Sequence, residues 1–471
     1  MKRFPAYLLI PSLLLTLMWV VPALAAPEAM GKMVLPNYKT VKLENGMTLL
    51  LMERHQLPLV SFRWLLKSGG SICDPEGREG LASLTARLLR KGTQSRNADQ
   101  ISQALDFVGA TLNAGASLEY SRGSAEFLRK DLNLAVDLLS DMLLHPSFPA
   151  DEADKMIKQE IDGIAEAKAV PLRVIQNYYE GFLFGSQLYG RPVGGSETSL
   201  AKITRNEIAN FYETHYVPNE LVFAVVGDFS ASELESSLRE KFAEWKPKKV
   251  ATPAVQETPA LQGKRILIVD KPDATQTFFR LGNVGLQRNS PDWIPVQVVN
   301  TLFGGRFTSM INSALRIESG LTYEATSFFS SRRGRGSFAV ASYTPNESTE
   351  RALKMTLDIL RSFHEKGISP EQLQSAKTYI KGQFGPTIET NDQMAATLGD
   401  LEFYGLGVQY INTYFDKIDA TTLVDAKRII QTYYPLNDLA IVLIGKGSVI
   451  DQVAKVLTSD VKKKAITDAG F

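Results

Sequence analysis

The sequence is poor in the residues that build metal clusters and covalent cross-links. Cys73 is the only cysteine among 471 residues, which excludes an intramolecular disulfide, a cysteine-rich zinc ribbon and an iron–sulfur cluster. The four histidines are spaced 90, 70 and 149 residues apart, so no local histidine pair can hold a metal. Neither sign of charge is in excess, with Lys+Arg 52 against Asp+Glu 51, and this argues against a general nucleic-acid binder.

The first 25 residues are typical of an export signal. A short basic head, Met1-Lys2-Arg3, precedes an uncharged and mostly apolar run from Tyr7 to Ala25, which ends in the cleavage pattern Ala23-Leu24-Ala25. A retained membrane anchor is the alternative, because nineteen uncharged residues nearly span a bilayer. Prolines within the run and small residues at its end favour cleavage near Ala25. We therefore expect an exported, periplasmic protein that keeps no stable membrane anchor.

Two similar segments, 218 residues apart, indicate an internal duplication. Residues 216–227 and 434–445 each hold a Tyr/Pro/Asn turn, an apolar strand and a glycine, and each follows an amphipathic helix. Residues 246–262, with three prolines, read as a linker too poor in large apolar residues to pack. This predicts an N-terminal domain over 26–245 and a C-terminal domain over 263–471; the alternative is one undivided α/β domain.

Local patterns predict an α+β fold in each half. Asn45-Gly46 predicts a hairpin turn between 40–43 and 48–52, and Val60, Phe62 and Trp64 alternate like a half-buried strand. Hairpin strands mixed with helix pairs favour a mostly antiparallel sheet covered by helices, an α/β sandwich, in each half. Helical spacing predicts helices over 80–90, 98–108, 132–144 and 151–167.

A series of motifs runs along the chain: Gly69-Gly70-Ser71, Gly77-Arg78-Glu79-Gly80-Leu81-Ala82, Leu88-Leu89-Arg90-Lys91-Gly92-Thr93, Pro146-Ser147-Phe148, Tyr189-Gly190-Arg191-Pro192-Val193-Gly194-Gly195, Gly304-Gly305 and Leu315-Arg316-Ile317-Glu318-Ser319-Gly320-Leu321-Thr322-Tyr323. In their order and spacing these motifs resemble the pitrilysin/insulinase-type (inverted-zincin) peptidases, particularly a two-domain subunit of the processing-peptidase kind. The resemblance covers the whole mature chain and implies two homologous halves in a clamshell arrangement.

The zinc motif of that family is degenerate here. The resemblance implies H-x-x-E-H on a helix, with two histidine ligands and a glutamate base, and a distal glutamate ligand about seventy residues later. Ser83-Leu84-Thr85-Ala86-Arg87 stands at the five motif positions, and Glu160 matches the distal ligand. One carboxylate beside a guanidinium cannot hold zinc, so we expect neither a metal site nor a catalytic residue in this chain.

The two residues left at this position are expected to pair. If the helices carrying Arg87 and Glu160 face one another, the guanidinium replaces the metal charge in a partly buried salt bridge, worth about 3 kcal/mol if solvent is excluded. The alternative is an outward-pointing Arg87 and a solvated Glu160.

The second half keeps another element of the family. The resemblance implies that Arg316 and Tyr323 bind substrate: the guanidinium donates to a peptide carbonyl, and the phenol stabilises a developing oxyanion. The alternative is an arginine paired with Glu318 and a tyrosine that fills the core.

The combination predicts a non-catalytic subunit of a periplasmic heterodimeric zinc metalloendopeptidase, inactive alone. A zinc-bearing paralogue is the expected partner and the holder of the zinc, and peptides or unfolded proteins are the expected substrates. The alternative is a binding or scaffolding protein that uses the peptidase fold without proteolysis. A neighbouring gene that encodes an intact H-x-x-E-H favours the heterodimer.

Overall fold

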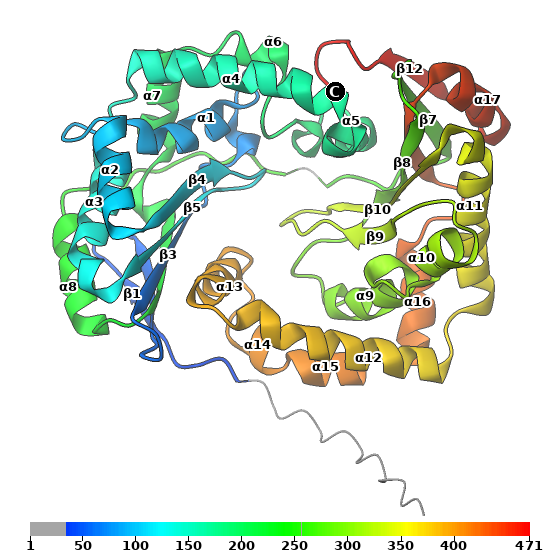
Figure 1. Ribbon diagram of the computed structural model, residues 1–471. Coiled ribbons are helices and arrows are strands. Elements are labelled where there is room, and N and C mark those ends of the chain that lie inside the picture. The colour runs from blue at the N-terminus through cyan, green and yellow to red at the C-terminus, as the bar shows by residue number, and fades with distance from the viewer. Residues whose placement is uncertain (1–33, 256) are drawn as a thin grey trace, which may run out of the picture. The chain divides into compact units, whose positions relative to one another are not determined.

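The computed structural model describes residues 34–255 and 257–471, so the predicted export signal lies outside the described residues. Two mixed six-stranded β-sheets, each covered by helices, make up the fold (Figure 1). The α+β fold in two homologous halves is confirmed, whereas the clamshell arrangement stays a prediction. No helix among the described residues is long and apolar enough to cross a membrane.

The first half holds six strands and eight α-helices in the described residues. Its elements are β1 Lys39–Lys42, β2 Thr48–Glu53, β3 Leu59–Leu66, α1 Leu81–Leu88, α2 Ala98–Val108, β4 Thr111–Ala116, β5 Ser121–Leu128, α3 Leu132–Leu144, α4 Ala150–Ala169, α5 Pro171–Phe184, α6 Glu197–Leu200, α7 Arg205–His215, β6 Leu221–Gly227 and α8 Ala231–Lys241.

The second half repeats this plan with a few additional short helices. Its elements are β7 Lys264–Asp270, β8 Gln276–Val284, α9 Trp293–Asn300, a π-helical turn Thr301–Gly305, α10 Met310–Asn312, a second π-helical turn Ser313–Glu318, β9 Ala325–Phe329, β10 Ser337–Pro345, α11 Thr349–Lys366, α12 Pro370–Phe384, α13 Asn391–Phe403, α14 Gln409–Asn412, α15 Tyr414–Ala420, α16 Leu423–Tyr433, β11 Leu439–Gly445, α17 Gly447–Leu457 and β12 Val461–Ala465.

The sheet orders confirm the duplication. The first sheet runs β1-β2-β6-β3-β5-β4 and the second β12-β7-β11-β8-β10-β9, so five strands follow one order in both. They differ at one edge, where β1 pairs antiparallel with β2 but β12 pairs parallel with β7. Most neighbouring strands are antiparallel in each sheet, and the predicted hairpin between β1 and β2 is present, with Gly46 at φ 87°.

Each sheet is covered on its second face by a helix from the other half (Figure 1). Helix α13 packs on β3 and β6 of the first sheet through Met394, Ala395 and Leu398. Helix α5 packs on β8 and β11 of the second sheet through Ile175 and Tyr178. This exchange explains why β6 and β11 are apolar without interruption and buried at every position.

The exchange also corrects two expectations from the sequence. Strand β3 is not half-buried: Leu65, on the face opposite Phe62, is covered by the cluster that contains α13. The segment 246–262 does pack in part. Thr258 is buried and its hydroxyl donates a hydrogen bond to the side-chain oxygen of Gln187, while Val255 and Leu261 contact the cluster that covers the second sheet.

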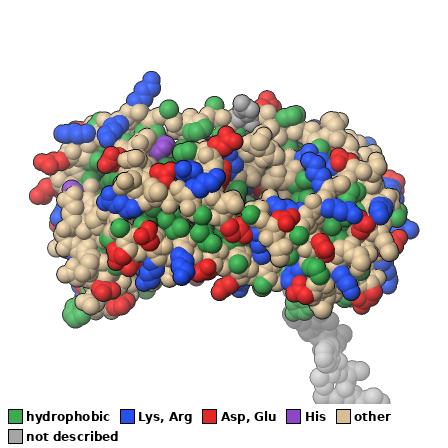
Figure 2. All heavy atoms as spheres, turned by 90° about the horizontal axis from the view of Figure 1, so that it is seen from above, with side chains coloured by type: hydrophobic (Ala, Val, Ile, Leu, Met, Phe, Trp, Pro, Cys, Tyr) green, Lys and Arg blue, Asp and Glu red, His purple; other side chains and the backbone are tan. Residues whose placement is uncertain are grey.

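Acidic and basic side chains are interspersed on the surface seen in Figure 2, without a field of one sign. This distribution agrees with the near-zero net charge of the sequence.

The exchange of helices predicts that the two halves unfold together. We expect Leu398→Ala, which removes a fully buried contact between α13 and the first sheet, to cost about 3 kcal/mol and to keep a single transition in denaturant. Thr397→Ala on the same helix is the matched control, since its hydroxyl bonds only the backbone of its own helix. Separate transitions for the two halves would contradict the interdependence.

Candidate functional site

A buried carboxylate fixes the start of the helix that carries the degenerate motif. Asp74 accepts hydrogen bonds from the backbone N–H groups of Gly80, at 2.9 Å, and Ala82, at 2.8 Å. It therefore satisfies donors at the N-terminus of α1, where Gly80 itself adopts φ 101°. Burial raises the pKa of Asp74 to about 8, although both N–H groups act in the opposite direction.

The helices of the degenerate motif face one another, as the sequence predicted. Arg87 on α1 forms a salt bridge with Glu160 on α4, and Lys91, just after α1, pairs with Glu152 nearer the start of α4 at 3.3 Å. Ala86, at the position of the catalytic base, is buried. The bridge is more exposed than expected, with 40% of the Arg87 side chain and 27% of the Glu160 side chain accessible. The condition for a contribution of about 3 kcal/mol, exclusion of solvent, is therefore not met, and solvent screens the pair.

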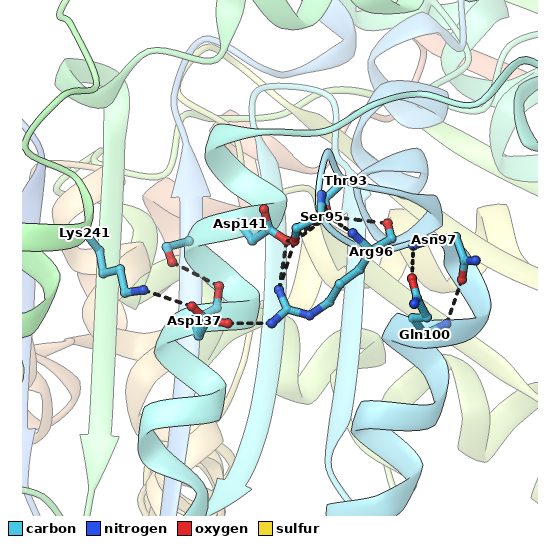
Figure 3. A network of polar contacts seen from close by, with 9 residues as sticks. Thr93, Ser95, Arg96, Asn97, Gln100, Asp137, Asp141 and Lys241 are labelled. Carbon is cyan, nitrogen blue, oxygen red and sulfur yellow. Dashed lines mark hydrogen bonds and ion pairs between the residues drawn. The ribbon is translucent and has the colours of Figure 1, made fainter.

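A polar network anchors the segment that follows α1 (Figure 3). Arg96 donates to Asp141 at 2.9 Å and to Asp137 at 2.7 Å, both on α3, and Lys241 of α8 donates to Asp137 at 2.9 Å. The hydroxyl of Thr93 also donates to Asp141, at 2.7 Å. The hydrogen bond from Lys241, reinforced by Arg96, lowers the pKa of Asp137. The network ties the end of the motif segment to two further helices.

The residues present do not fit a zinc ion. Serine, alanine and arginine stand at the motif positions, and the remaining carboxylate, Glu160, is already bound to the guanidinium of Arg87. Within residues 34–255 and 257–471, no group of three or more His, Cys, Asp or Glu side chains is placed to hold a metal ion. We therefore derive no metal chemistry from this half.

Arg316 and Tyr323 lie together in the second half. The guanidinium of Arg316 is 4.2 Å from the ring centroid of Tyr323 and 4.7 Å from that of Phe307. Two aromatic faces therefore hold the cation, which leaves its N–H edge available as a donor. Tyr323 is 71% exposed and does not fill the core. The alternative of a tyrosine that fills the core is therefore wrong.

The loop between these two residues is pinned by hydrogen bonds. The backbone N–H of Leu321 donates to the carbonyl of Leu315 at 2.8 Å, and Gly320 adopts the left-handed φ of 63° that the turn requires. Thr344 on β10 donates to the carbonyl of Leu321 at 2.7 Å. Tyr323 is thereby held over Arg316 in the loop just before β9.

A cavity of about 450 Å³ surrounds the pair and is lined also by Arg306, Phe307 and Tyr379. Gly304 lies in its wall, where a Cβ atom would meet the Ser327 hydroxyl at 2.3 Å. Sequence reasoning recognised the glycines but missed Phe307, although an aromatic residue three positions after Gly304 was the available signal. The cavity has the size of a binding site for a small ligand or a short peptide segment.

Two family models match the chain. One is described as Insulinase (Peptidase family M16) and matches residues 57–191. The other is described as Peptidase M16 inactive domain and matches residues 202–380. The first match contains α1 and Glu160, and the second contains Arg316 and Tyr323.

Individual relatives cover most of the chain. It is 28% identical to an uncharacterized zinc protease of Mycobacterium leprae, over 72% of this chain and 77% of that protein. It is 22% identical to a protein of Helicobacter pylori named a non-peptidase homolog, over 83% of this chain and 90% of that protein. A solved peptidase M16 inactive domain from Pseudomonas fluorescens superposes with a TM-score of 0.81 at 25% identity, over 87% of this chain and 98% of that one.

The exposure of the bridge between Arg87 and Glu160 predicts a small energetic coupling. In a double-mutant cycle of Arg87→Ala and Glu160→Ala, we expect a coupling of about 0.5–1 kcal/mol in the free energy of unfolding, which falls as salt is raised. Urea denaturation measures it. A coupling of about 3 kcal/mol would instead indicate a pair from which solvent is excluded.

The convergence of α1 and α4 predicts that the lost metal site can be rebuilt. The wild-type chain is expected to hold no stoichiometric zinc, whereas Ser83→His combined with Arg87→His supplies two imidazoles beside Glu160. Cobalt titration, followed by visible absorption, tests for one site per chain. Adding Glu160→Gln is the matched control and is expected to weaken binding about tenfold or more. Tight zinc in the wild type would contradict the interpretation of α1.

Proposed function

Because the chain belongs to the insulinase family of peptidases (peptidase family M16), we propose that it is the non-catalytic subunit of a heterodimeric zinc metalloendopeptidase. In this proposal a zinc-bearing paralogue carries the metal and the catalytic base. The present chain supplies Arg316 and Tyr323 to that active site in trans and has no peptidase activity alone.

The observation that carries the proposal is the contrast between the two halves. In the first half, Glu160, the one ligand-type residue at the positions where the family resemblance implies zinc ligands, is held by Arg87. In the second, Arg316 is fixed between two rings at the wall of an open cavity, and Tyr323 is largely exposed above it. A chain that had lost all proteolytic roles would have no need for such a preorganised donor pair.

The geometry supports a defined chemical role for each residue. The N–H groups of Arg316 donate to a carbonyl of the bound peptide and position the scissile bond. The hydroxyl of Tyr323 donates to the oxygen that gains negative charge during attack on that bond. Both donors are in place before substrate binds, because the stacked rings and the hydrogen-bonded loop hold them.

The proposal places the complex in the periplasm. The export signal over residues 1–25 is the sequence feature that supports this, and cleavage near Ala25 would release the mature chain. Peptides or unfolded proteins of that compartment are the proposed substrates.

We expect the assembled enzyme to depend on this chain's donor pair. Arg316→Ala or Tyr323→Phe is expected to lower kcat/KM by about 10²-fold, because each removes a donor to the reacting peptide. Peptide cleavage by the chain co-purified with its zinc-bearing paralogue measures this. Arg361→Ala is the matched control, since that exposed side chain bonds only Asp358 on its own helix.

The same experiment separates the proposal from a scaffolding role. Turnover that stays unchanged in both variants of a folded, assembled complex would remove Arg316 and Tyr323 from the mechanism. That result would favour a protein that uses the peptidase fold only for binding.

A further inference from the structure

Arg63 and Arg280 occupy equivalent positions in the two sheets. Arg63 on β3 lies opposite Ala224 of β6, and Arg280 on β8 lies opposite Val442 of β11. Ala224 and Val442 are themselves separated by the 218 residues of the duplication. The register of the sheets therefore identifies the two arginines as copies of one position.

The helices that cover these arginines also correspond. Helix α5 begins at Pro171 and α13 at Asn391, and each packs on the central strands of the opposite sheet. Their buried positions match at a constant offset, which makes Leu172 the equivalent of Asp392. The matching positions are Val174 with Met394, Ile175 with Ala395, Tyr178 with Leu398 and Tyr179 with Gly399.

In the first sheet, the arginine binds a carboxylate. The Nε of Arg63 donates to Asp392 Oδ1 at 2.6 Å, and its Nη2 donates to Oδ2 of the same residue. This two-point contact is the preferred geometry between a guanidinium and a carboxylate.

In the second sheet, the acid is absent and the arginine remains. Leu172 replaces it and is 54% exposed. Within the described part of the chain, Nε and Nη1 of Arg280 are buried and have no hydrogen-bond partner. Arg280 and Leu172 line one cavity of about 140 Å³. This volume suits the end of one side chain rather than a whole ligand.

The guanidinium of Arg280 lacks a hydrogen-bonded acid among the described residues. Burial lowers its pKa, although the charge of Glu180 acts in the opposite direction, and an arginine keeps its proton in proteins. Glu180 forms no hydrogen bond with Arg280: it accepts from Gln176 and Ser337 at 2.6 and 2.7 Å and lies 3.6 Å from Arg332. The ring of Phe328 lies 5.2 Å from the guanidinium carbon of Arg280. Buried N–H groups without an acceptor are costly, and a bound carboxylate would relieve that cost.

The Arg280 cavity adjoins the cavity of Arg316 and Tyr323. Glu324, directly before β9, and Thr326 and Phe328 within it line both cavities. A peptide that lies along Tyr323 therefore reaches Arg280 past this edge strand. Glu324 is exposed and is the one acidic residue in the wall that the structure describes for the smaller cavity.

We propose that Arg280 and the cavity beside Leu172 form a subsite for a carboxylate of the peptide substrate, a glutamate or aspartate side chain or the C-terminal carboxylate. This inference rests on the proposed function and adds a substrate preference to it. The internal precedent is Asp392, which presents the same group to the equivalent arginine.

Peptide binding to the isolated full chain tests the subsite without any activity. The probes are fluorescent peptides of an otherwise uncharged sequence. Each carries one glutamate, or glutamine as its neutral match, at one of several successive positions. Each is made both with a free C-terminal acid and with a C-terminal amide. At low salt, we expect glutamate at one register, or the free acid, to bind about tenfold or more tightly than its neutral match. The first result assigns a side chain, and the second assigns the C-terminus.

A substitution at position 172 provides the sharpest control. Leu172→Asp rebuilds the pair seen between Arg63 and Asp392, so it is expected to abolish the carboxylate preference and to raise the melting temperature above that of Leu172→Asn. Leu172→Asn is expected to keep the preference. Arg280→Met is expected to lose the carboxylate preference. If that variant fails to fold, the comparison of Leu172→Asp with Leu172→Asn still tests the subsite. Glu324→Gln is expected to bind acidic peptides at least as tightly as the wild-type chain does.

The failures of the two proposals are distinguishable. If no peptide shows a carboxylate preference, or if Leu172→Asp and Leu172→Asn behave alike, the subsite is wrong whatever the enzyme does. If Leu172→Asp blocks assembly with the paralogue but leaves peptide binding unchanged, the carboxylate belongs to the partner, and the subsite is likewise overturned. A preference in an assembly without peptidase activity would support the subsite and contradict the catalytic role.

Discussion

Each half of this fold depends on a helix donated by the other. A six-stranded sheet with an uninterrupted apolar central strand has two faces to bury, and the helices of its own half cover only one. Helices α13 and α5 cover the second faces reciprocally, so neither sheet is complete without the opposite half. The chemistry-bearing segments, α1 in the first half and the loop before β9 in the second, therefore sit on one interdependent scaffold.

The two halves have diverged in opposite directions on this common scaffold. In the first half, the guanidinium of Arg87 binds the carboxylate of Glu160 at the positions where the family resemblance implies a zinc site. An arginine at that position is compatible with the fold because its side chain remains partly solvated. In the second half, the guanidinium of Arg316 lies over the rings of Phe307 and Tyr323, and all three residues line a cavity. One half has gained an internal partner for its charge, and the other has kept a charge available for binding.

Local features were predictable from the sequence, whereas long-range features were not. The ranges 98–108 and 132–144 match α2 and α3, and the hairpin turn at Asn45-Gly46 was placed correctly, because periodicity and turn chemistry are local. The bridge between Arg87 and Glu160 followed from the family's spacing, but its exposure did not. The alternation of Val60, Phe62 and Trp64 suggested one solvated face, since no local pattern tells which distant helix will cover a strand.

The duplication itself then supplies information that no single half contains. Equivalent positions in the two halves share backbone geometry. When a residue is present in both copies but its partner is present in only one, the other copy lacks an interaction that its position can make. Arg63 with Asp392, and Arg280 with Leu172, form such a comparison. Arg280 is buried like a group that binds a carboxylate, but two of its N–H groups lack the hydrogen bonds that Arg63 makes. Under the proposed function, a carboxylate of a peptide bound beside Arg316 and Tyr323 would supply the acceptor that Arg280 lacks.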